Sequence, residues 1–263
     1  MSISVWILTF NRPEALNRLI EHFGLEGFTV NIFSNHPVVK IKRELLDKKY
    51  VNQVIVNTLN SEISNAYCTR SWNSIYQKGF MLSEELIVLQ DDTDIGSNFK
   101  YWIEEQSKKF DFIAGPAGDQ FHYIKKSVLQ KVGWWDERFA GACYCGDADY
   151  WKRVYYEYDK DKISIEDTHN WGFKHNVCGL MNNVITTFES KTIDKDYENQ
   201  HWFLEKLNKC NNVLKYNQDW FKQKWGIDLD IGRPVVENYN RLVSEINWYP
   251  SYTKEFNITT YET

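Results

Sequence analysis

Three carboxylates lie within four residues in the segment Asp91-Asp92-Thr93-Asp94, directly after the apolar run Leu86–Leu89. Neighbouring carboxylates repel one another unless a cation compensates their charge, and oxygen ligands of this kind suit Mg²⁺ or Mn²⁺. A divalent cation held there could bridge the two phosphates of a nucleotide diphosphate and neutralise the charge of a leaving group. The segment therefore predicts a metal site, and the alternative is a solvated acidic loop or a helix cap.

The hydrophobic pattern around this segment indicates strands that alternate with helices. We predict a helix opened by Pro13, a helix over residues 64–80, and strands over residues 3–10, 28–33, 54–56 and 84–90. Such alternation predicts a parallel sheet, and open parallel sheets bind ligands at the carboxyl ends of their strands. The turns after residues 9, 33 and 89 are therefore expected to converge on one crevice.

The remainder of the chain continues the α/β pattern. We predict strands over residues 112–114 and 162–165, and helices over residues 124–132 and 147–158. The region after about residue 190 is polar and helical in character, and about residues 244–263 show little periodicity, as an arm or tail would.

The composition excludes several partners. The formal net charge is −5, so the chain has no basic field that would hold the phosphate backbone of a nucleic acid. The N-terminus shows no positively charged leader, and nowhere do about 18 apolar residues follow one another. The five cysteines lack the spacing of a zinc site or a disulfide framework, which indicates reduced thiols. We expect a soluble, cytoplasmic protein without a transmembrane segment, and its oligomeric state stays open.

Several segments carry motifs in a characteristic order. They are the opening strand and turn Val5–Pro13, the polar residues Asn65, Arg70 and Asn73, the acidic segment Leu89–Asp94, the Gly-aromatic-Asp-Glu segment within Val132–Phe139, and the acidic helix start within Gly146–Arg153. Together they resemble the motifs of inverting GT-A glycosyltransferases of the family 2 type. The segment Tyr216–Gly226 resembles the closing segment of many such transferases, which supports the family without indicating a role.

This resemblance spans about residues 3–226 and implies an α/β fold of the Rossmann-like GT-A type, with a mostly parallel twisted sheet flanked by helices. It implies a catalytic domain over residues 1–190, with a nucleotide-binding half at 1–95 and an acceptor-binding half at 96–190, and a helical extension with a tail over 191–263. The implied reaction transfers a sugar from a nucleotide-diphospho-sugar, with UDP favoured, to a hydroxyl of a glycan acceptor. It would need Mn²⁺ or Mg²⁺ and would invert the anomeric centre by direct displacement.

The resemblance also implies the reacting groups. Asp147 matches the general base, which takes a proton from the acceptor hydroxyl, and a helix N-terminus would keep it ionised until then. Gly146 departs from the family, which usually has Glu there. Asp92 matches the metal ligand, and Asp94 joins it if Asp92-Thr93-Asp94 is the family's D-x-D motif. His169 is a further candidate ligand, with His175 as the alternative.

The remaining candidate residues would bind the donor and the acceptor. By the resemblance, the nucleotide pocket comprises Thr9, Asn11, Arg12, Asn35, Arg70, Asn73, Asp91 and Asp92. The sugar and acceptor side comprises Asp119, Gln120, Trp134, Trp135, Asp136 and Asp149. The two tryptophans would form a floor for a sugar ring, whereas the plain alternatives are core packing for them and helix capping for Asp147 and Asp149.

Three other functions are alternatives to a transferase. A phosphotransferase with an aspartate nucleophile shows D-x-D-x-T or D-x-D-x-V, an order that Asp91–Ile95 does not match. A sugar nucleotidyltransferase opens with a glycine-rich loop after its first strand, and residues 9–13 contain no glycine. A non-catalytic carbohydrate-binding module would use aromatic platforms without a donor pocket, so metal-dependent nucleotide binding distinguishes it from a transferase.

Overall fold

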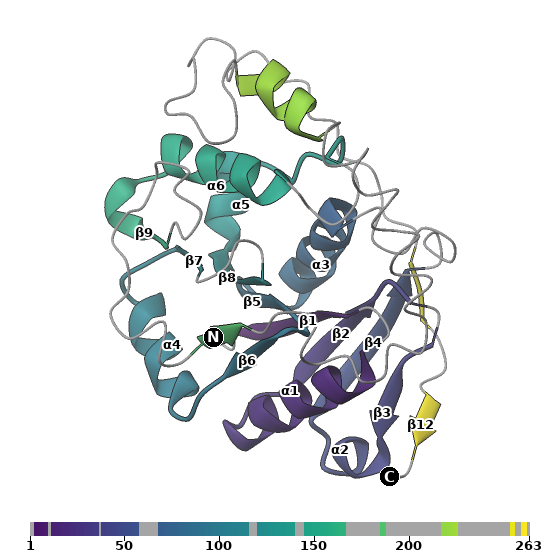
Figure 1. The fold of residues 1–263 in the computed structure, drawn as a ribbon. Helices are drawn as coiled ribbons and strands as arrows, with labels where there is room; N and C mark the ends of the chain where they lie inside the picture. The colour runs from purple at the N-terminus through teal and green to yellow at the C-terminus, as the bar shows by residue number, and fades with distance from the viewer. Residues whose placement is uncertain are drawn as a thin grey trace.

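The computed structural model describes residues 3–9, 12–36, 38–57, 68–115, 120–139, 145–166, 185–187, 217–225, 253–255 and 259–261. Its centre is an eight-stranded sheet (Figure 1). The strands lie in the order β11 (Thr253–Glu255), β4 (Val51–Asn57), β2 (Val30–Ser34), β1 (Ser4–Thr9), β5 (Glu85–Gln90), β8 (Phe121–Lys125), β7 (Phe112–Ala114) and β9 (Ile163–Ile165).

The four strands β4, β2, β1 and β5 run parallel to one another. Thr9 pairs with Ser34 and Leu8 pairs with Gln90, so the carboxyl ends of β1, β2 and β5 lie next to one another. The antiparallel strand β8 separates this group from β7 and β9, which again run in the direction of β5. The predicted α/β fold with a mostly parallel sheet is therefore confirmed.

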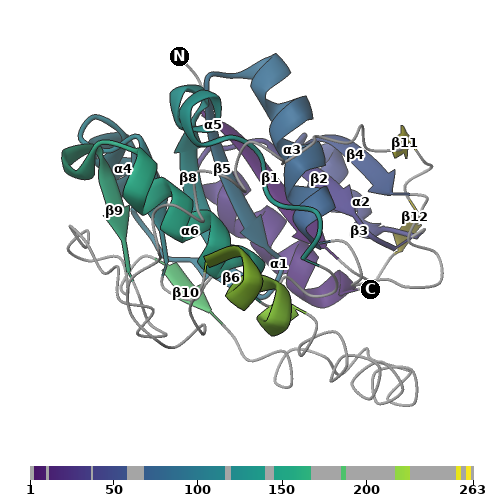
Figure 2. The same ribbon diagram turned by 90° about the horizontal axis from the view of Figure 1, so that it is seen from above.

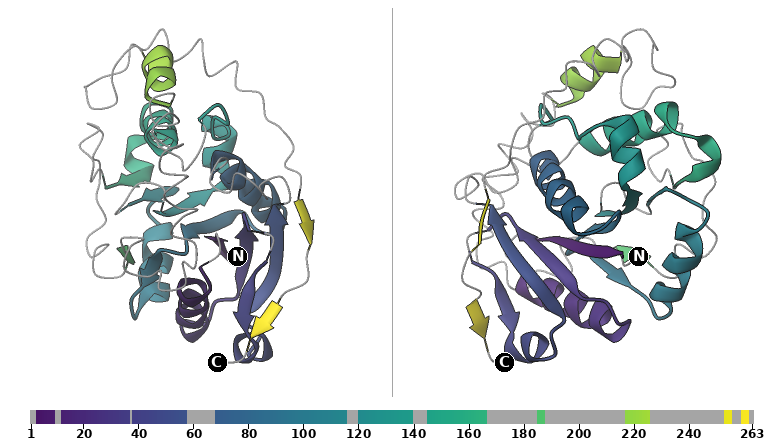
Figure 3. Two further views of the ribbon diagram at one scale, coloured as in Figure 1. Left: turned by 45° about the vertical axis from the view of Figure 1, so that its right-hand side comes forward. Right: turned by 180° about the vertical axis from the view of Figure 1, so that it is seen from behind.

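Helices cover both faces of this sheet. One face packs against α1 (Pro13–Leu25), α2 (Arg43–Asp47) and α4 (Phe99–Ser107), and the other packs against α3 (Cys68–Leu82), α5 (Lys126–Val132), α6 (Gly146–Glu157) and a helix over residues 217–225. Figure 3 shows the sheet between α1 (purple) and α3 (blue). Side chains of β1 alternate between the faces, because successive residues of a strand point in opposite directions: Val5 and Ile7 join one core, and Trp6 and Leu8 join the other.

Smaller elements complete the described chain. The strand β6 (Thr93–Ile95) follows β5 and pairs antiparallel with β10 (Ile185–Thr187), and β3 (Lys40–Lys42) pairs parallel with β12 (Thr259–Tyr261). A 3-10 helix, η3 (Lys160–Lys162), precedes β9. Among the described residues, none of the helices combines the length and apolar character that crossing a bilayer requires.

The structure corrects several element boundaries. Residues 121–125 form β8, so the helix predicted over 124–132 begins only at Lys126. The helix α4 and the strands β3 and β6 were not predicted, because elements of three to nine residues give little periodicity. Within residues 244–263, β11 and β12 pair with β4 and β3, so parts of the predicted tail are strands. These strands form because they pair with a sheet edge that is distant in the sequence, and their own sequence pattern does not reveal that pairing.

Candidate active site

The carboxyl ends of β1 and β5 are joined through the acidic segment. Thr9 Oγ1 donates a hydrogen bond of 2.5 Å to Asp91 Oδ2, and the Asp91 amide donates to the Leu8 carbonyl at 3.0 Å. Arg12, at the start of α1, places its Nη1 atom 3.2 Å from Asp91 Oδ1 and 3.3 Å from Asp92 Oδ2. The predicted convergence of the turns after residues 9 and 89 is therefore confirmed.

The three carboxylates of this segment differ in what they contact. Asp94 has both oxygens engaged: Arg18 Nε lies 2.9 Å from Oδ2, and His22 Nδ1 lies 2.5 Å from Oδ1. Asp92 is only 6% exposed, and its buried Oδ1 atom receives no hydrogen bond from the residues that the structure describes. An unsatisfied buried carboxylate oxygen is costly and suits a cation. The geometry thus favours Asp92 as a ligand and gives no support to the role predicted for Asp94.

Arginine side chains already compensate part of the charge of the acidic segment. The sequence predicted a divalent cation as the compensating charge, whereas in the structure Arg12 and Arg18 supply two positive charges within ion-pair distance. Within the described part of the chain, no three His, Cys, Asp or Glu side chains are grouped as metal ligands. His169 and His175 lie outside the described residues, so their roles stay predictions. A cation at this site would have Asp92 as its one described protein ligand.

A cavity adjoins the acidic segment. Its empty volume is about 220 Å³ including open solvent, and its lining residues are Thr9, Arg12, Pro13, Leu16, Ser34, Val38, Val39 and Lys40. The lining combines apolar side chains with the polar groups of Thr9 and Ser34 and the cations Arg12 and Lys40, and the enclosed space is far smaller than a nucleotide. Two predicted nucleotide-binding residues, Thr9 and Arg12, therefore line this cavity, and Asn11 lies outside the described residues.

Three other predicted nucleotide-binding residues form contacts between separate segments of the protein. Asn35 follows β2 and accepts a hydrogen bond of 2.9 Å from Ser71 of α3. Asn73 exchanges hydrogen bonds with the backbone of Trp135, and it donates to Glu137 at 2.9 Å. Arg70 Nε lies 3.1 Å from Glu137 Oε2. These contacts fasten residues 135–137 to the first turns of α3, so Asn73 in particular has its amide occupied.

Glu137 was not among the site residues predicted from the sequence. In the structure its side chain is only 5% exposed. Burial raises its pKa above the usual glutamate range, while the hydrogen bond from Asn73 and the charge of Arg70 act in the opposite direction. Its partners Arg70 and Asn73 were both predicted site residues. Two such polar side chains on one helix are a signal in the sequence for an acidic partner.

Asp147 lies in the first turn of α6, where it is partly exposed, and its Oδ1 atom accepts a hydrogen bond of 2.9 Å from the Ala148 amide. The helix leads into β9, which runs in the direction of β5, so α6 begins at the carboxyl edge of the sheet. Figure 2 shows the helix over 217–225 (yellow-green) beside α6, to which Lys224 and Trp225 bind through Asp149.

Asp136 and Asp149 are buried in an ionic network. Lys224 Nζ lies 2.9 Å from Asp136 Oδ2 and 2.6 Å from Asp149 Oδ1. Arg153 Nε lies 3.0 Å from Asp149 Oδ2, and Arg138 Nε lies 2.7 Å from Asp136 Oδ1. Burial would raise the pKa of Asp136, but Lys224 and Arg138 together hold it well below the usual range. The geometry favours positioning roles over the predicted substrate contacts of the two aspartates.

Lys224 was missed as a functional candidate, although the sequence held a signal. Phe221, Lys224 and Trp225 share the apolar face of one helix, at spacings of three and four residues. A lysine on such a face needs a buried carboxylate as partner, because an unpaired charge in the core is very unfavourable. The sequence could therefore have predicted an acidic partner for Lys224, but not which one.

The predicted sugar floor is only partly available. Trp135 has no exposed surface and stacks on Tyr150, with ring centroids 4.5 Å apart and planes 4° apart. The prediction that Trp135 stacks on a sugar is therefore wrong, because its ring is buried in the core. Trp134 is partly buried against the same core. The Gln120 carbonyl accepts a hydrogen bond of 2.9 Å from Thr93, which places Gln120 beside the acidic segment, and Asp119 lies outside the described residues.

Comparisons with known proteins give little further information. No protein-family model and no curated protein matches the chain. Among solved structures, the chain is similar to HddC from Yersinia pseudotuberculosis, which was crystallised in complex with GMP-PN. The two share 13% identity at a TM-score of 0.33, over 49% of this chain and 79% of HddC. A likeness at this level carries no inference about function.

Proposed function

We propose that this chain is a metal-dependent glycosyltransferase, which moves a sugar from a nucleotide diphosphate, with UDP favoured, to a hydroxyl of a glycan. The transfer would invert the anomeric centre by direct displacement. One observation carries the proposal: the acidic segment with its unsatisfied Asp92 oxygen and the start of α6 with Asp147 belong to the same edge of the sheet.

A series of contacts connects these two groups along that edge. Asp91 is bound to Thr9 at the end of β1, and Asn35 at the end of β2 is bound to Ser71 of α3. Arg70 of α3 is paired with Glu137, and the adjacent Asp136 shares Lys224 with Asp149 in the first turn of α6. Ligands of open parallel sheets bind at this edge, which supports one site between the two groups.

Each part of the edge suits one component of the reaction. The shallow cavity beside Thr9 and Arg12 marks where the nucleotide would bind at this edge, and Arg12 can pair with a phosphate as well as with Asp91. Asp92 would hold a divalent cation, whose charge would offset the charge that develops on the leaving diphosphate. Asp147 is partly exposed and can accept the proton of the attacking hydroxyl.

Calorimetry of the full chain with UDP and with GDP, each with and without Mn²⁺, tests the donor site. We expect nucleotide binding that depends on Mn²⁺, followed by slow metal-dependent hydrolysis of one nucleotide sugar in a panel. A chain that binds sugars but neither nucleotide, with or without metal, would instead be a carbohydrate-binding module, and the proposal would be abandoned.

A further inference from the structure

The helix over residues 217–225 reaches the site region through buried charges. The side chains of Lys224 and Arg153 have no exposed surface, and those of Asp136 and Asp149 are at most 2% exposed. Two indole N–H groups of the same helix add to the network, because Trp225 donates to Asp149 at 2.9 Å and Trp220 donates to Asp136 at 3.3 Å. One helix thus binds two separate acidic segments at once.

The placement of Asp149 determines what this network controls. Residues of an α-helix are about 100° apart around its axis, so Asp147 and Asp149 lie about 200° apart, on nearly opposite sides of α6. Asp149 is fully buried, whereas Asp147 is partly exposed. Fixing Asp149 on the buried side therefore fixes the rotation of the first turn and the direction in which Asp147 points.

The backbone at this point is held in an unusual conformation. Cys145, the residue before α6, has φ 70° in the left-handed region, which a side chain other than glycine rarely adopts. Its carbonyl accepts a hydrogen bond of 3.0 Å from the Asp149 amide. Such a conformation persists where its surroundings determine it, and the fixed Asp149 is one of them.

We propose that Lys224 is a positioning residue: by pairing with Asp149 and Asp136 together, it sets the orientation of the first turn of α6 and hence of Asp147. This inference rests on the proposed transferase function, in which Asp147 is the base. Lys224 itself touches no substrate. It acts by holding α6 against residues 136–138, which α3 fastens from the other side through Glu137.

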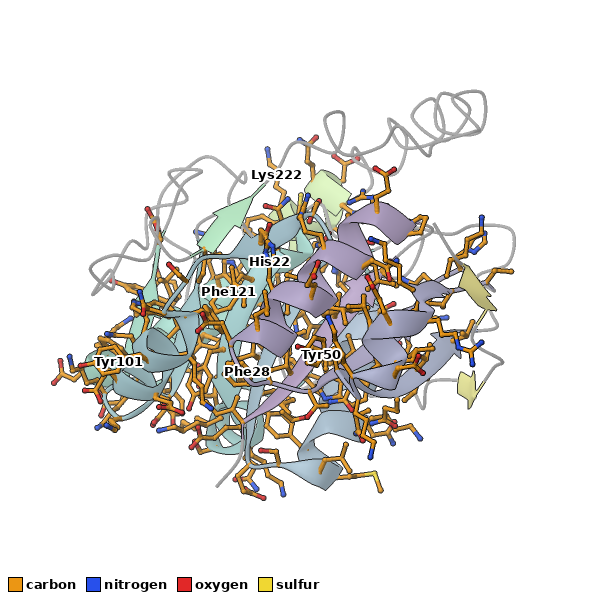
Figure 4. The ribbon with its side chains drawn as sticks, turned by 90° about the horizontal axis from the view of Figure 1, so that it is seen from below. His22, Phe28, Tyr50, Tyr101, Phe121 and Lys222 are labelled. Carbon is orange, nitrogen blue, oxygen red and sulfur yellow. The ribbon has the colours of Figure 1, made fainter. Side chains whose placement is uncertain are left out.

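The test compares three variants of the full chain. Lys224→Met removes the charge and retains an apolar side chain of similar length, and Trp225→Phe removes the indole donor to Asp149 while keeping a smaller aromatic ring. The matched control is Lys222→Met, because Lys222 is exposed on the same helix (labelled in Figure 4). For each variant, thermal unfolding, Mn²⁺-dependent UDP affinity, and the kcat and KM of transfer are measured well below the unfolding temperature.

We expect Lys224→Met to lower kcat by about tenfold to a hundredfold, since a displacement of about 1 Å can cost that much. Trp225→Phe should lower kcat in the same direction by a smaller factor. UDP affinity should stay near that of the wild type in both, because the donor cavity lies at Thr9 and Arg12. This split between kcat and nucleotide affinity would not follow from a general loss of structure.

Two results would overturn the inference: a folded Lys224→Met with the kcat of the control, or a parallel loss of kcat and UDP affinity. If Lys224→Met fails to fold, Trp225→Phe decides by the same criteria. A wild-type chain that neither binds UDP nor transfers a sugar would refute the proposed function, and the positioning role with it. The wild-type measurement therefore distinguishes that failure from a failure of the variants.

Discussion

Thr9 Oγ1 lies 2.5 Å from Asp91 Oδ2, across 82 residues of sequence, and joins the ends of two adjacent parallel strands. Because Asp91 is bound by Thr9 and Arg12, it cannot turn toward a ligand without breaking two contacts. Asp94 is likewise held by Arg18 and His22. Asp92, between them, is the acid of this segment whose second oxygen receives no hydrogen bond from the described residues.

Asp92 and Asp94 therefore give a matched comparison for metal binding. Asp92→Asn should weaken Mn²⁺-dependent UDP binding by about tenfold or more, because even residues that only support a metal ligand contribute that much. Asp94→Asn should leave this affinity close to that of the wild type, because Arg18 and His22 already occupy its oxygens. Titration calorimetry with and without Mn²⁺ measures both, and equal losses in the two variants would contradict the assignment.

Asp147→Asn should remove the group that accepts the proton of the acceptor hydroxyl. General-base catalysis contributes about 10²- to 10⁴-fold, so kcat should fall within that range. UDP affinity should hardly change, because the nucleotide cavity is lined by other elements. Single-turnover transfer and nucleotide calorimetry check the two halves of this prediction, and normal turnover in the variant would exclude Asp147 as the base.

Lys224→Met should destabilise the folded protein as well as slow the reaction. Removing Lys224 leaves Asp136 paired only with Arg138 and Asp149 only with Arg153, and breaking a buried ion pair costs up to about 3–5 kcal/mol. The exposed Lys222→Met should change the free energy of unfolding by no more than about 0.5 kcal/mol. Urea unfolding of both variants gives the comparison, and a loss in Lys224→Met as small as in the control would show that the network contributes little.

His122 predicts a specific pH dependence of stability. The ring is fully buried among aromatic side chains, accepts or donates one hydrogen bond of 2.8 Å with the Tyr76 hydroxyl, and has its pKa lowered by burial from 6.5 to about 3. Between these values the unfolded chain binds a proton that the folded chain does not. Above pH 6.5 the neutral His122 ring therefore costs the folded protein no stability. As the pH falls from 6.5 toward 3, the free energy of unfolding decreases by up to about 1.4 kcal/mol per pH unit.

Replacing this ring by His122→Phe should remove that slope. The variant loses the partner of the Tyr76 hydroxyl, so it should be less stable at neutral pH, but the difference should shrink as the pH falls. Denaturant unfolding across the range provides the measurement. An unchanged difference between variant and wild type at every pH would mean that His122 does not titrate between the two states.

The adjacent tryptophans should separate stability from function. Trp135→Ala should cost about 3–5 kcal/mol, because it leaves a cavity where the ring stacks on Tyr150. Trp134 is only partly buried, so Trp134→Ala should cost clearly less and should act mainly on the KM for the acceptor. Thermal unfolding and acceptor kinetics check this pair, and equal destabilisation of the two variants would argue against the distinction.

The long, strongly periodic elements could be predicted from the sequence, because their own residues specify them. Pro13 with its apolar positions gives α1, the run before Asp91 gives β5, and the acidic start with Trp151 and Val154 on one side gives α6. The convergence of the turns after β1 and β5 also followed from the sequence, since parallel strands bring their carboxyl ends to one edge.

Which polar side chains remain available was decided only by the tertiary structure. Asp92 and Asp94 look alike in the sequence, yet Arg18 and His22 of α1 pair with one and not the other. Trp134 and Trp135 are neighbours in the sequence, but only Trp135 stacks on Tyr150 in the core. Local sequence determines an element and the face it buries, whereas the partner of each charge or ring comes from segments tens of residues away.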